Sequence, residues 1–225
     1  MYIKFKKIIK MKENLFEARY DVTKKSKIKK FYESYKILIF STILVLILAI
    51  ASVSFYSEFK EKKKTLLADN YIEAKVYLEN GDKIIAKDIL KTIIFANNST
   101  YSTLSLFLIL NENLIVDREE LLRLFNHVLE NNKFEKEVKN LIIFKKALFQ
   151  SNFVSELELL ETAKPLINNE TLWKPHALLL LGNYFVSKKE YLKAKEFYTQ
   201  ILSLRGLHKE LYEQARSQLV FIAND

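Results

Sequence analysis

Residues 176–202 read HALLLLGNYFVSKKEYLKAKEFYTQIL, and the fold class is predicted first from these residues. It holds two apolar-periodic segments of helical length, and the small residues Gly182 in the first and Ala194 in the second lie 12 positions apart. Small side chains let two helices approach closely, so the spacing predicts an antiparallel helix pair. Larger apolar residues fill the layer to the neighbouring helices: Leu178, Leu181, Phe185, Tyr198 and Ile201.

This pattern resembles the tetratricopeptide repeat, W-x-x-L-G-x-x-Y followed by A-x-x-x-F. The same frame recurs near residue 80, where Ala74 and Ala86 are again 12 positions apart. One such repeat cannot bury its own apolar face, so a stack of helical hairpins, a solenoid, is expected. Residues 100–168 keep the helical period without the small-residue signature, so their helix pairs are either divergent repeats or plain helical hairpins. An unrelated helical bundle is the alternative architecture for the domain.

An all-α fold is predicted for the whole chain. Gly (3) and Pro (2) are scarce, which favours long helices over the turn-rich sequences of β folds. Joints rich in Asn, Asp, Gly and Ser separate the apolar segments and supply helix stops and N-caps. The predicted helices are 64–80, 83–96, 100–115, 117–131, 135–151, 155–168, 173–187, 190–204 and 208–223.

Residues 37–57, ILIFSTILVLILAIASVSFYS, contain no charge and are long enough to cross a hydrocarbon core of roughly 30 Å. They predict a single transmembrane helix in contact with membrane lipid. Two alternatives are a buried core helix and a cleaved signal peptide, for which Ala49-Ile50-Ala51 resembles a cleavage site.

The distribution of Lys and Arg around the apolar stretch predicts how the chain is oriented across the membrane. Residues 1–36 carry 12 Lys/Arg, whereas the other flank has four lysines within residues 60–64. The positive-inside rule therefore places the N-terminus in the cytoplasm. In a bacterium the protein would sit in the inner membrane with three parts: a basic cytoplasmic segment (1–36), the transmembrane helix (37–57) and a periplasmic repeat domain (58–225). Lipid contact and topology explain the basic segment better than nucleic-acid binding does.

The sequence offers no catalytic or cofactor signature. It has no Cys, no Gly-rich phosphate loop, and three His (His127, His176 and His208) that lack metal-ligand spacing. A non-enzyme without metal, cofactor or small-molecule substrate is therefore expected.

Protein binding is the expected activity. In tetratricopeptide stacks the first helix of each pair lines the concave face. The repeat frame then predicts seven inward-facing, protein-binding candidates: Tyr71, Lys75 and Leu78 in the first repeat, and His176, Leu179, Asn183 and Val186 in the last. For each of them, the alternative is ordinary helix surface or packing between repeats.

The layout resembles the YfgM-like family, ancillary subunits of the bacterial SecYEG translocon. The resemblance rests on Asn14-Leu15-Phe16-Glu17, on residues 29–35 (KKFYESY) before the span, and on residues 99–106 (STYSTLSL), where Ser105 replaces the family's Ala. It implies a membrane-anchored scaffold beside the translocon that hands exported proteins to periplasmic chaperones. The alternative is an adaptor in envelope assembly or cell division with a fixed protein partner.

Overall fold

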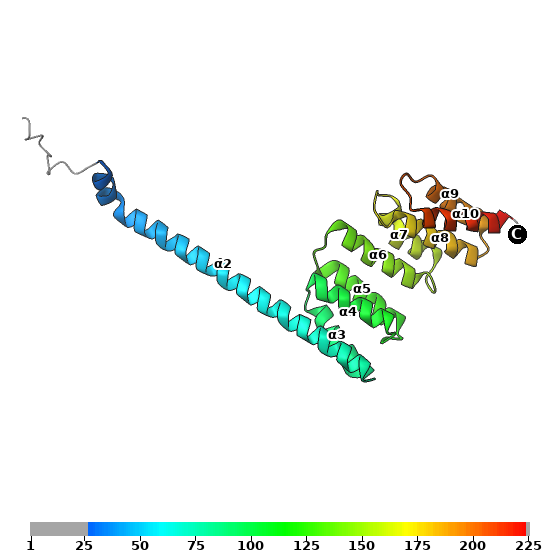
Figure 1. The fold of residues 1–225 in the computed structure, drawn as a ribbon, viewed down its shortest axis with the longest axis horizontal. Coiled ribbons are helices and arrows are strands. Elements are labelled where there is room, and N and C mark those ends of the chain that lie inside the picture. Colours follow the sequence, from blue (N-terminus) through cyan, green and yellow to red (C-terminus); the bar gives the residue numbers. More distant parts are fainter. Residues whose placement is uncertain (1–26, 224–225) are drawn as a thin grey trace, which may run out of the picture. The chain divides into compact units, whose positions relative to one another are not determined.

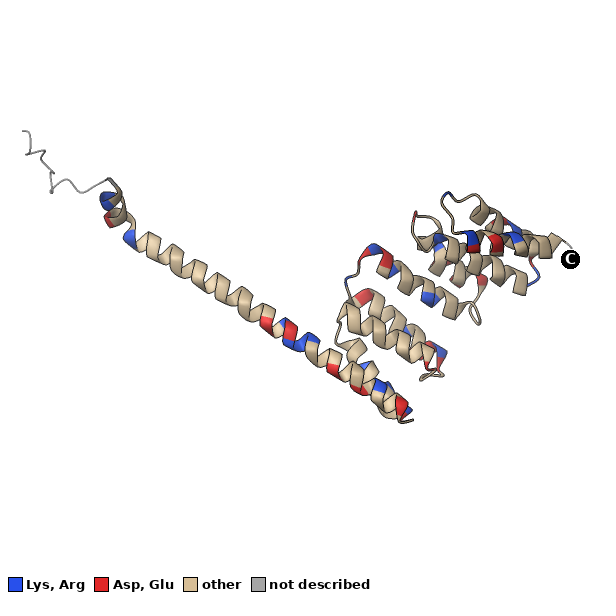
Figure 2. Cartoon of the chain, viewed as in Figure 1, with Lys and Arg blue, Asp and Glu red and all other residues tan. Residues whose placement is uncertain are grey.

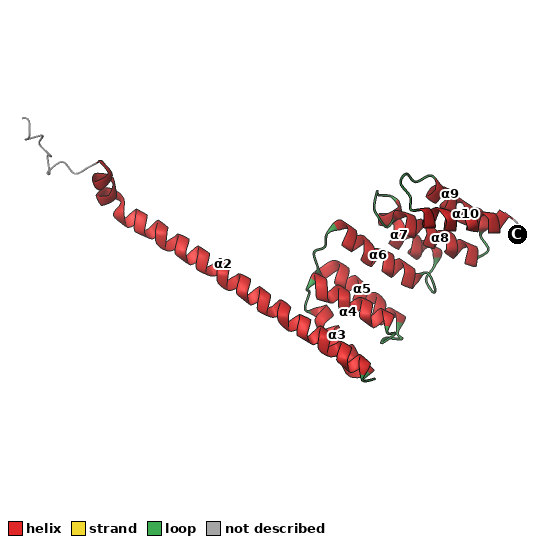
Figure 3. Ribbon diagram, viewed as in Figure 1, coloured by secondary structure: helices red, strands yellow, loops and turns green. Residues whose placement is uncertain are grey.

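The computed structural model describes residues 27–223, and within this range it contains nine helices and no strand (Figure 3). The predicted all-α class is therefore confirmed for the described part of the chain. The Asn14–Glu17 motif and most of the basic segment lie outside the described residues. The described chain divides at Lys62–Lys63 into two compact units.

Helix α2 (Lys27–Glu79) contains the apolar stretch that was expected to cross a membrane. Within residues 37–57 every side chain is exposed except that of Ile39, which is half-buried. The stretch has no charged residue, whereas charged residues flank it on both sides (Figure 2). The hydroxyls of Ser41, Thr42 and Ser52 donate to helix carbonyls three or four residues earlier, so the helix itself satisfies these polar groups. One helix of the described chain is thus long and apolar enough to span a membrane.

No helix begins at residue 64, where one was predicted, because α2 continues through this region without a break. The intervening residues 58–64, EFKEKKK, contain neither Gly nor Pro and consist largely of good helix formers. Nothing in that segment therefore ends the helix.

The second unit contains a series of short helices, each packed against the next from α3 to α10 (Figure 1). Helix α8 also contacts α6 and α10. Their bounds are α3 (Lys83–Phe95), α4 (Ser99–Asn111), α5 (Arg118–Asn131), α6 (Lys136–Gln150), α7 (Glu156–Ile167), α8 (Lys174–Ser187), α9 (Tyr191–Leu202) and α10 (Lys209–Ala223).

These bounds agree with the predicted ranges to within two residues, except at the end of α4. The prediction extended that helix to residue 115, but it ends at Asn111. Asn113 adopts a φ of +50°, a left-handed conformation that Asn tolerates and that stops a helix.

Two apolar clusters form the core of this unit. The first gathers buried side chains from α2 to α6, among them the fully buried Leu90 and Phe125. The second gathers side chains from α6 to α10, among them Phe185 and Tyr198. Because α6 contributes Ile142 to the first cluster and Ala147 to the second, it joins the two halves.

The small residues of the repeat frame lie at buried helix contacts. Ala74, Ala86 and Ala194 are completely buried. Gly182 is buried against the ring of Tyr198, where an added Cβ would lie 2.8 Å from Cζ and 2.9 Å from Cδ1. The backbone of α8 therefore comes close to α9 because residue 182 has no side chain.

Serine is the small residue between α3 and α4. Ser102 and Ser105 are completely buried, and the Ser102 hydroxyl lies 3.2 Å and 3.0 Å from the carbonyl oxygens of Ile93 and Ile94, to which it donates. A buried hydroxyl bonded to the last turn of α3 ties the two helices together, and no Gly or Ala marks this contact in the sequence.

Candidate protein-binding surface

Four predicted binding residues share one face of α8. His176, Leu179, Asn183 and Val186 are spaced by three or four positions, which keeps them on one side of a helix. The structure places three of them at two hollows, which are described below. Val186 instead is half-buried and packs against the second core cluster.

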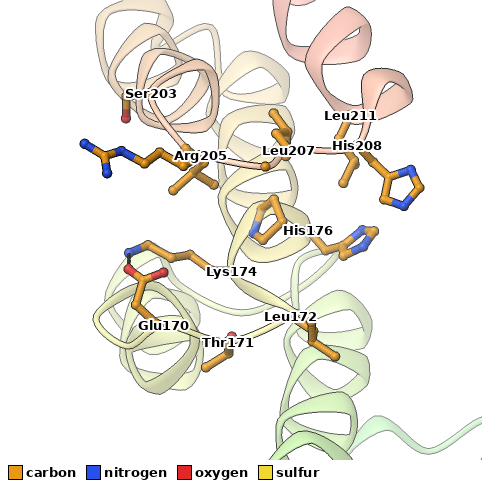
Figure 4. A pocket seen from close by; sticks show the side chains of 13 residues that line it. Glu170, Thr171, Leu172, Lys174, His176, Ser203, Arg205, Leu207, His208 and Leu211 are labelled. Atoms are coloured by element: carbon orange, nitrogen blue, oxygen red, sulfur yellow. Dashed lines mark hydrogen bonds and ion pairs between the residues drawn. The ribbon is translucent and has the colours of Figure 1, made fainter.

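The first hollow, called the basal pocket below, has a volume of about 520 Å³. It lies between the first turn of α8, the segment before it, and the connection from α9 to α10 (Figure 4). Leucines and a proline form its apolar part: Leu172, Pro175, Leu204, Leu207 and Leu211. This volume falls within the range of pockets that take ligands or side chains from a partner.

Cationic and imidazole groups form the polar part of the basal pocket. Arg205 and Lys174 border one side, and His176 and His208 border the other (Figure 4). Lys174 Nζ pairs with Glu170 Oε1 at 2.9 Å. Among the described residues, Arg205 and the His208 ring have no hydrogen bond or ion pair. The pocket therefore has two permanent cations and one carboxylate.

Aromatic packing fixes the position of His176. Its ring centroid lies 5.6 Å from that of Trp173 and 5.9 Å from that of Phe144. Trp173 stacks on Phe144 and donates from Nε1 to the carbonyl oxygen of Glu137 at 3.1 Å. Burial lowers the pKa of His176, which keeps its imidazole neutral at neutral pH.

The second hollow, called the seam groove below, has a volume of about 370 Å³ and lies between α8 and α10. Leu179 and Asn183 line it from α8, and Gln214, Ser217 and Gln218 line it from α10. The amide oxygen of Asn183 accepts from the Tyr198 hydroxyl at 2.7 Å. Because that bond fixes the amide, its NH₂ group is presented at the surface of α8 as a donor.

The two hollows lie along the same pair of helices. We call this surface the α8–α10 seam and define it by His176, Leu179 and Asn183 on α8 with Leu211, Gln214 and Ser217 on α10. His176 and Asn183 are seven positions apart, which corresponds to a helical rise of about 10 Å. An extended peptide advances roughly 3.3 Å per residue, so about three of its residues would cover this length.

The predicted binding residues on α2 lie apart from this seam. The half-buried Tyr71 packs on the first core cluster with its ring centroid 6.3 Å from that of Tyr101, and burial raises its pKa. Leu78 is half-buried and Lys75 is exposed. Helices α4 to α7 separate this end of α2 from α8 (Figure 1). The structure thus brings together three of the predicted binding residues on α8. The three predicted on α2 lie at the other end of the series of helices.

Sequence reasoning missed the contribution of α10 and of the connection before it. The α10 residues of the seam groove are polar and lie at helical spacing: Gln214, Ser217 and Gln218. Any solvent-exposed helix face shows the same pattern, so the sequence does not mark them as part of a binding surface. A turn signal was present at Gly206, whose φ of +68° lets the chain reverse between α9 and α10 and brings Arg205 to the pocket.

No group of three or more His, Asp or Glu side chains that could hold a metal ion occurs among residues 27–223. His127 instead bonds Asn97 Oδ1 at 2.8 Å. No protein-family model, curated protein or solved structure matches this chain. Its function is therefore inferred from the geometry of the seam and from the apolar stretch of α2.

Proposed function

We propose that this protein is a membrane-anchored scaffold that binds other polypeptides on the α8–α10 seam. The observation that carries the proposal is a pair of hollows with lining residues on both α8 and α10. The first, about 520 Å³, lies at the start of α8 beside the α9–α10 connection, and the second, about 370 Å³, lies between α8 and α10. Such a surface suits an extended chain, because apolar side chains enter the hollows while amide groups bond the peptide backbone.

The membrane anchor is the apolar stretch of α2. At about 1.5 Å per residue, its 21 residues cover the hydrocarbon thickness, and its exposed surface suits lipid. The excess of Lys/Arg before the span supports a cytoplasmic N-terminus. The helical unit then lies on the opposite side, which in a bacterial inner membrane is the periplasm.

The helical unit is proposed to be a tetratricopeptide-like solenoid. Supporting this, the Gly182 and Ala194 positions are buried where α8 meets α9, and Ala74 and Ala86 are buried at equivalent places in the frame. Stacks of this kind leave one helix of each pair available to partners.

The partners proposed for the scaffold are translocon subunits, exported polypeptides and periplasmic chaperones. The resemblance of residues 29–35 and 99–106 to the YfgM-like family supports this choice. An exported chain emerges unfolded, so its apolar side chains and backbone amides are available to a surface like the seam.

Binding of a permanently unfolded polypeptide to the purified full-length protein in detergent tests the proposal. The probe is a fluorescein-labelled chain whose cysteines are blocked with an uncharged group, and anisotropy reports binding. Gln214→Trp fills the seam groove from an exposed position, so we expect at least about tenfold weaker binding.

Gln200→Trp is the matched control, because Gln200 is exposed on α9 and does not line the seam. Binding that survives Gln200→Trp but not Gln214→Trp supports the seam as the site. If the two variants bind the unfolded polypeptide with equal affinity, the seam is excluded as the binding site.

A further inference from the structure

We propose that the basal pocket selects polypeptide segments in which an apolar side chain lies beside a carboxylate. The inference rests on the proposed function, because it specifies which polypeptides the α8–α10 seam prefers. It follows from the chemistry of the pocket lining, from the unpaired groups at its border, and from the charge of the chain itself.

The apolar part of the pocket accepts an aliphatic or aromatic side chain. Leu207 and Leu211 lie on one side of the opening, and Leu172, which is 73% exposed, lies on the other (Figure 4). Leu204 also lines the pocket. Most of the surface of Leu172 is therefore in contact with water in the described chain. Covering it with a peptide side chain removes apolar surface from water and stabilises the complex.

The polar part of the pocket favours an anion. Arg205 has no ion pair in the described chain, so its guanidinium keeps all five donors for a ligand, and guanidinium binds carboxylates in a bidentate manner. Lys174 is only 19% exposed and pairs with a carboxylate, that of Glu170, which is 90% exposed. An incoming carboxylate can share the Lys174 ammonium, since an ammonium carries three donors.

Both imidazoles are compatible with this preference. His176 and His208 border the pocket opposite Arg205, and each ring nitrogen that carries a proton can donate to a carboxylate (Figure 4). The lining has one acidic residue, Glu170, so a carboxylate ligand meets more donors than acceptors.

The chain's own basic segment is a poor occupant. Residues 1–36 contain 12 Lys/Arg and four Asp/Glu, and this positive charge would meet the cations of the pocket. The seam groove favours a polypeptide over a compact ligand, because both hollows have lining residues on α8 and a peptide anchored in the pocket can extend along that helix toward Asn183.

Matched peptides on the full-length protein in detergent test the inference. One fluorescein-labelled eight-residue peptide alternates leucine with aspartate or glutamate, and its partner replaces each acid by the corresponding amide. We expect the acidic peptide to bind about tenfold more tightly at low salt, and the preference to shrink as salt screens the charges.

Arg205→Gln should abolish most of the preference, whereas Arg216→Gln should keep it, because Arg216 is exposed on α10 outside the pocket. Equal affinity for the two peptides, or an equal effect of the two arginine substitutions, overturns the inference.

The same experiment separates this inference from the proposed function. If both peptides bind equally and Gln214→Trp blocks both, the charge preference is refuted while polypeptide binding at the seam stands. If neither peptide nor the unfolded polypeptide binds, both proposals fail.

Discussion

Gly182→Ala is predicted to destabilise the protein although it adds only one methyl group. The added Cβ would lie 2.8 Å from Cζ and 2.9 Å from Cδ1 of Tyr198. Cε1 of the same ring would lie closer still. Carbon atoms without a bond between them normally approach to about 3.5–4.0 Å, so the ring or the backbone must shift by roughly 1 Å. The ring has little freedom, because Tyr198 is completely buried and its hydroxyl bonds Asn183 at 2.7 Å.

The two energies involved have opposite signs. Overpacking a filled core costs about 1–3 kcal/mol. Replacing Gly by Ala inside a helix returns about 1 kcal/mol, because Ala has the higher helix propensity. The expected net loss in the free energy of unfolding is therefore up to about 2 kcal/mol, whereas an open site would show a gain of about 1 kcal/mol.

Urea unfolding of the full-length protein in detergent, followed by fluorescence, measures this loss. Trp173 is the single Trp, and it reports the packing of α8 because its ring stacks on Phe144. Thr199→Ala is the control, since Thr199 is exposed beside Tyr198 on α9 and its loss should change stability by less than about 0.5 kcal/mol. A Gly182→Ala protein that is more stable than the parent would refute the close approach of α8 and α9.

Three further predictions concern other parts of the molecule. Ala194→Leu should cost about 1–3 kcal/mol in the free energy of unfolding, because Ala194 is completely buried; an unchanged melting temperature would contradict the repeat frame. Burial raises the pKa of Tyr198 to about 12, above the value near 10 of an unfolded chain, so the unfolded state loses this proton first. Stability should therefore fall between pH 10 and 12, and the fall should be smaller in Tyr198→Phe than in the parent, as followed by urea unfolding. Leu46→Arg places a charge at the middle of the apolar stretch of α2, which should destabilise insertion into the bilayer by about 2.5–3.5 kcal/mol. Alkaline carbonate should therefore extract more of Leu46→Arg from membranes than of the control variant Leu46→Ala. Equal extraction of the two variants would argue against a spanning helix.

The helices of the second unit could be predicted because local chemistry determines where they begin and end. Asn98 and Ser155 lie at joints between apolar segments, and their side chains accept from the amides of Tyr101 and Glu158 as N-caps. The start predicted at residue 64 was wrong, because a lysine-rich segment without Gly or Pro continues a helix as readily as it ends one.

The candidate site could be predicted only in part. The spacing of His176, Leu179 and Asn183 gives one face of α8, since helical periodicity is a local property. The other wall of the seam depends on how α10 crosses α8, which side chains distant in sequence decide. The hydrogen bond from Tyr198 to Asn183 joins residues 15 positions apart, and no local sequence pattern predicts it.

Crosslinking from the seam in the native membrane tests the central claim most directly. A photoreactive amino acid at position 214 of the full-length protein, with position 200 as the control, would be activated in intact cells, and the attached chains would be identified by mass spectrometry. The proposed scaffold predicts that position 214 captures exported precursors and translocon subunits, and that position 200 captures far fewer. Equal capture from both positions, or capture of cytoplasmic proteins alone from position 214, would contradict it.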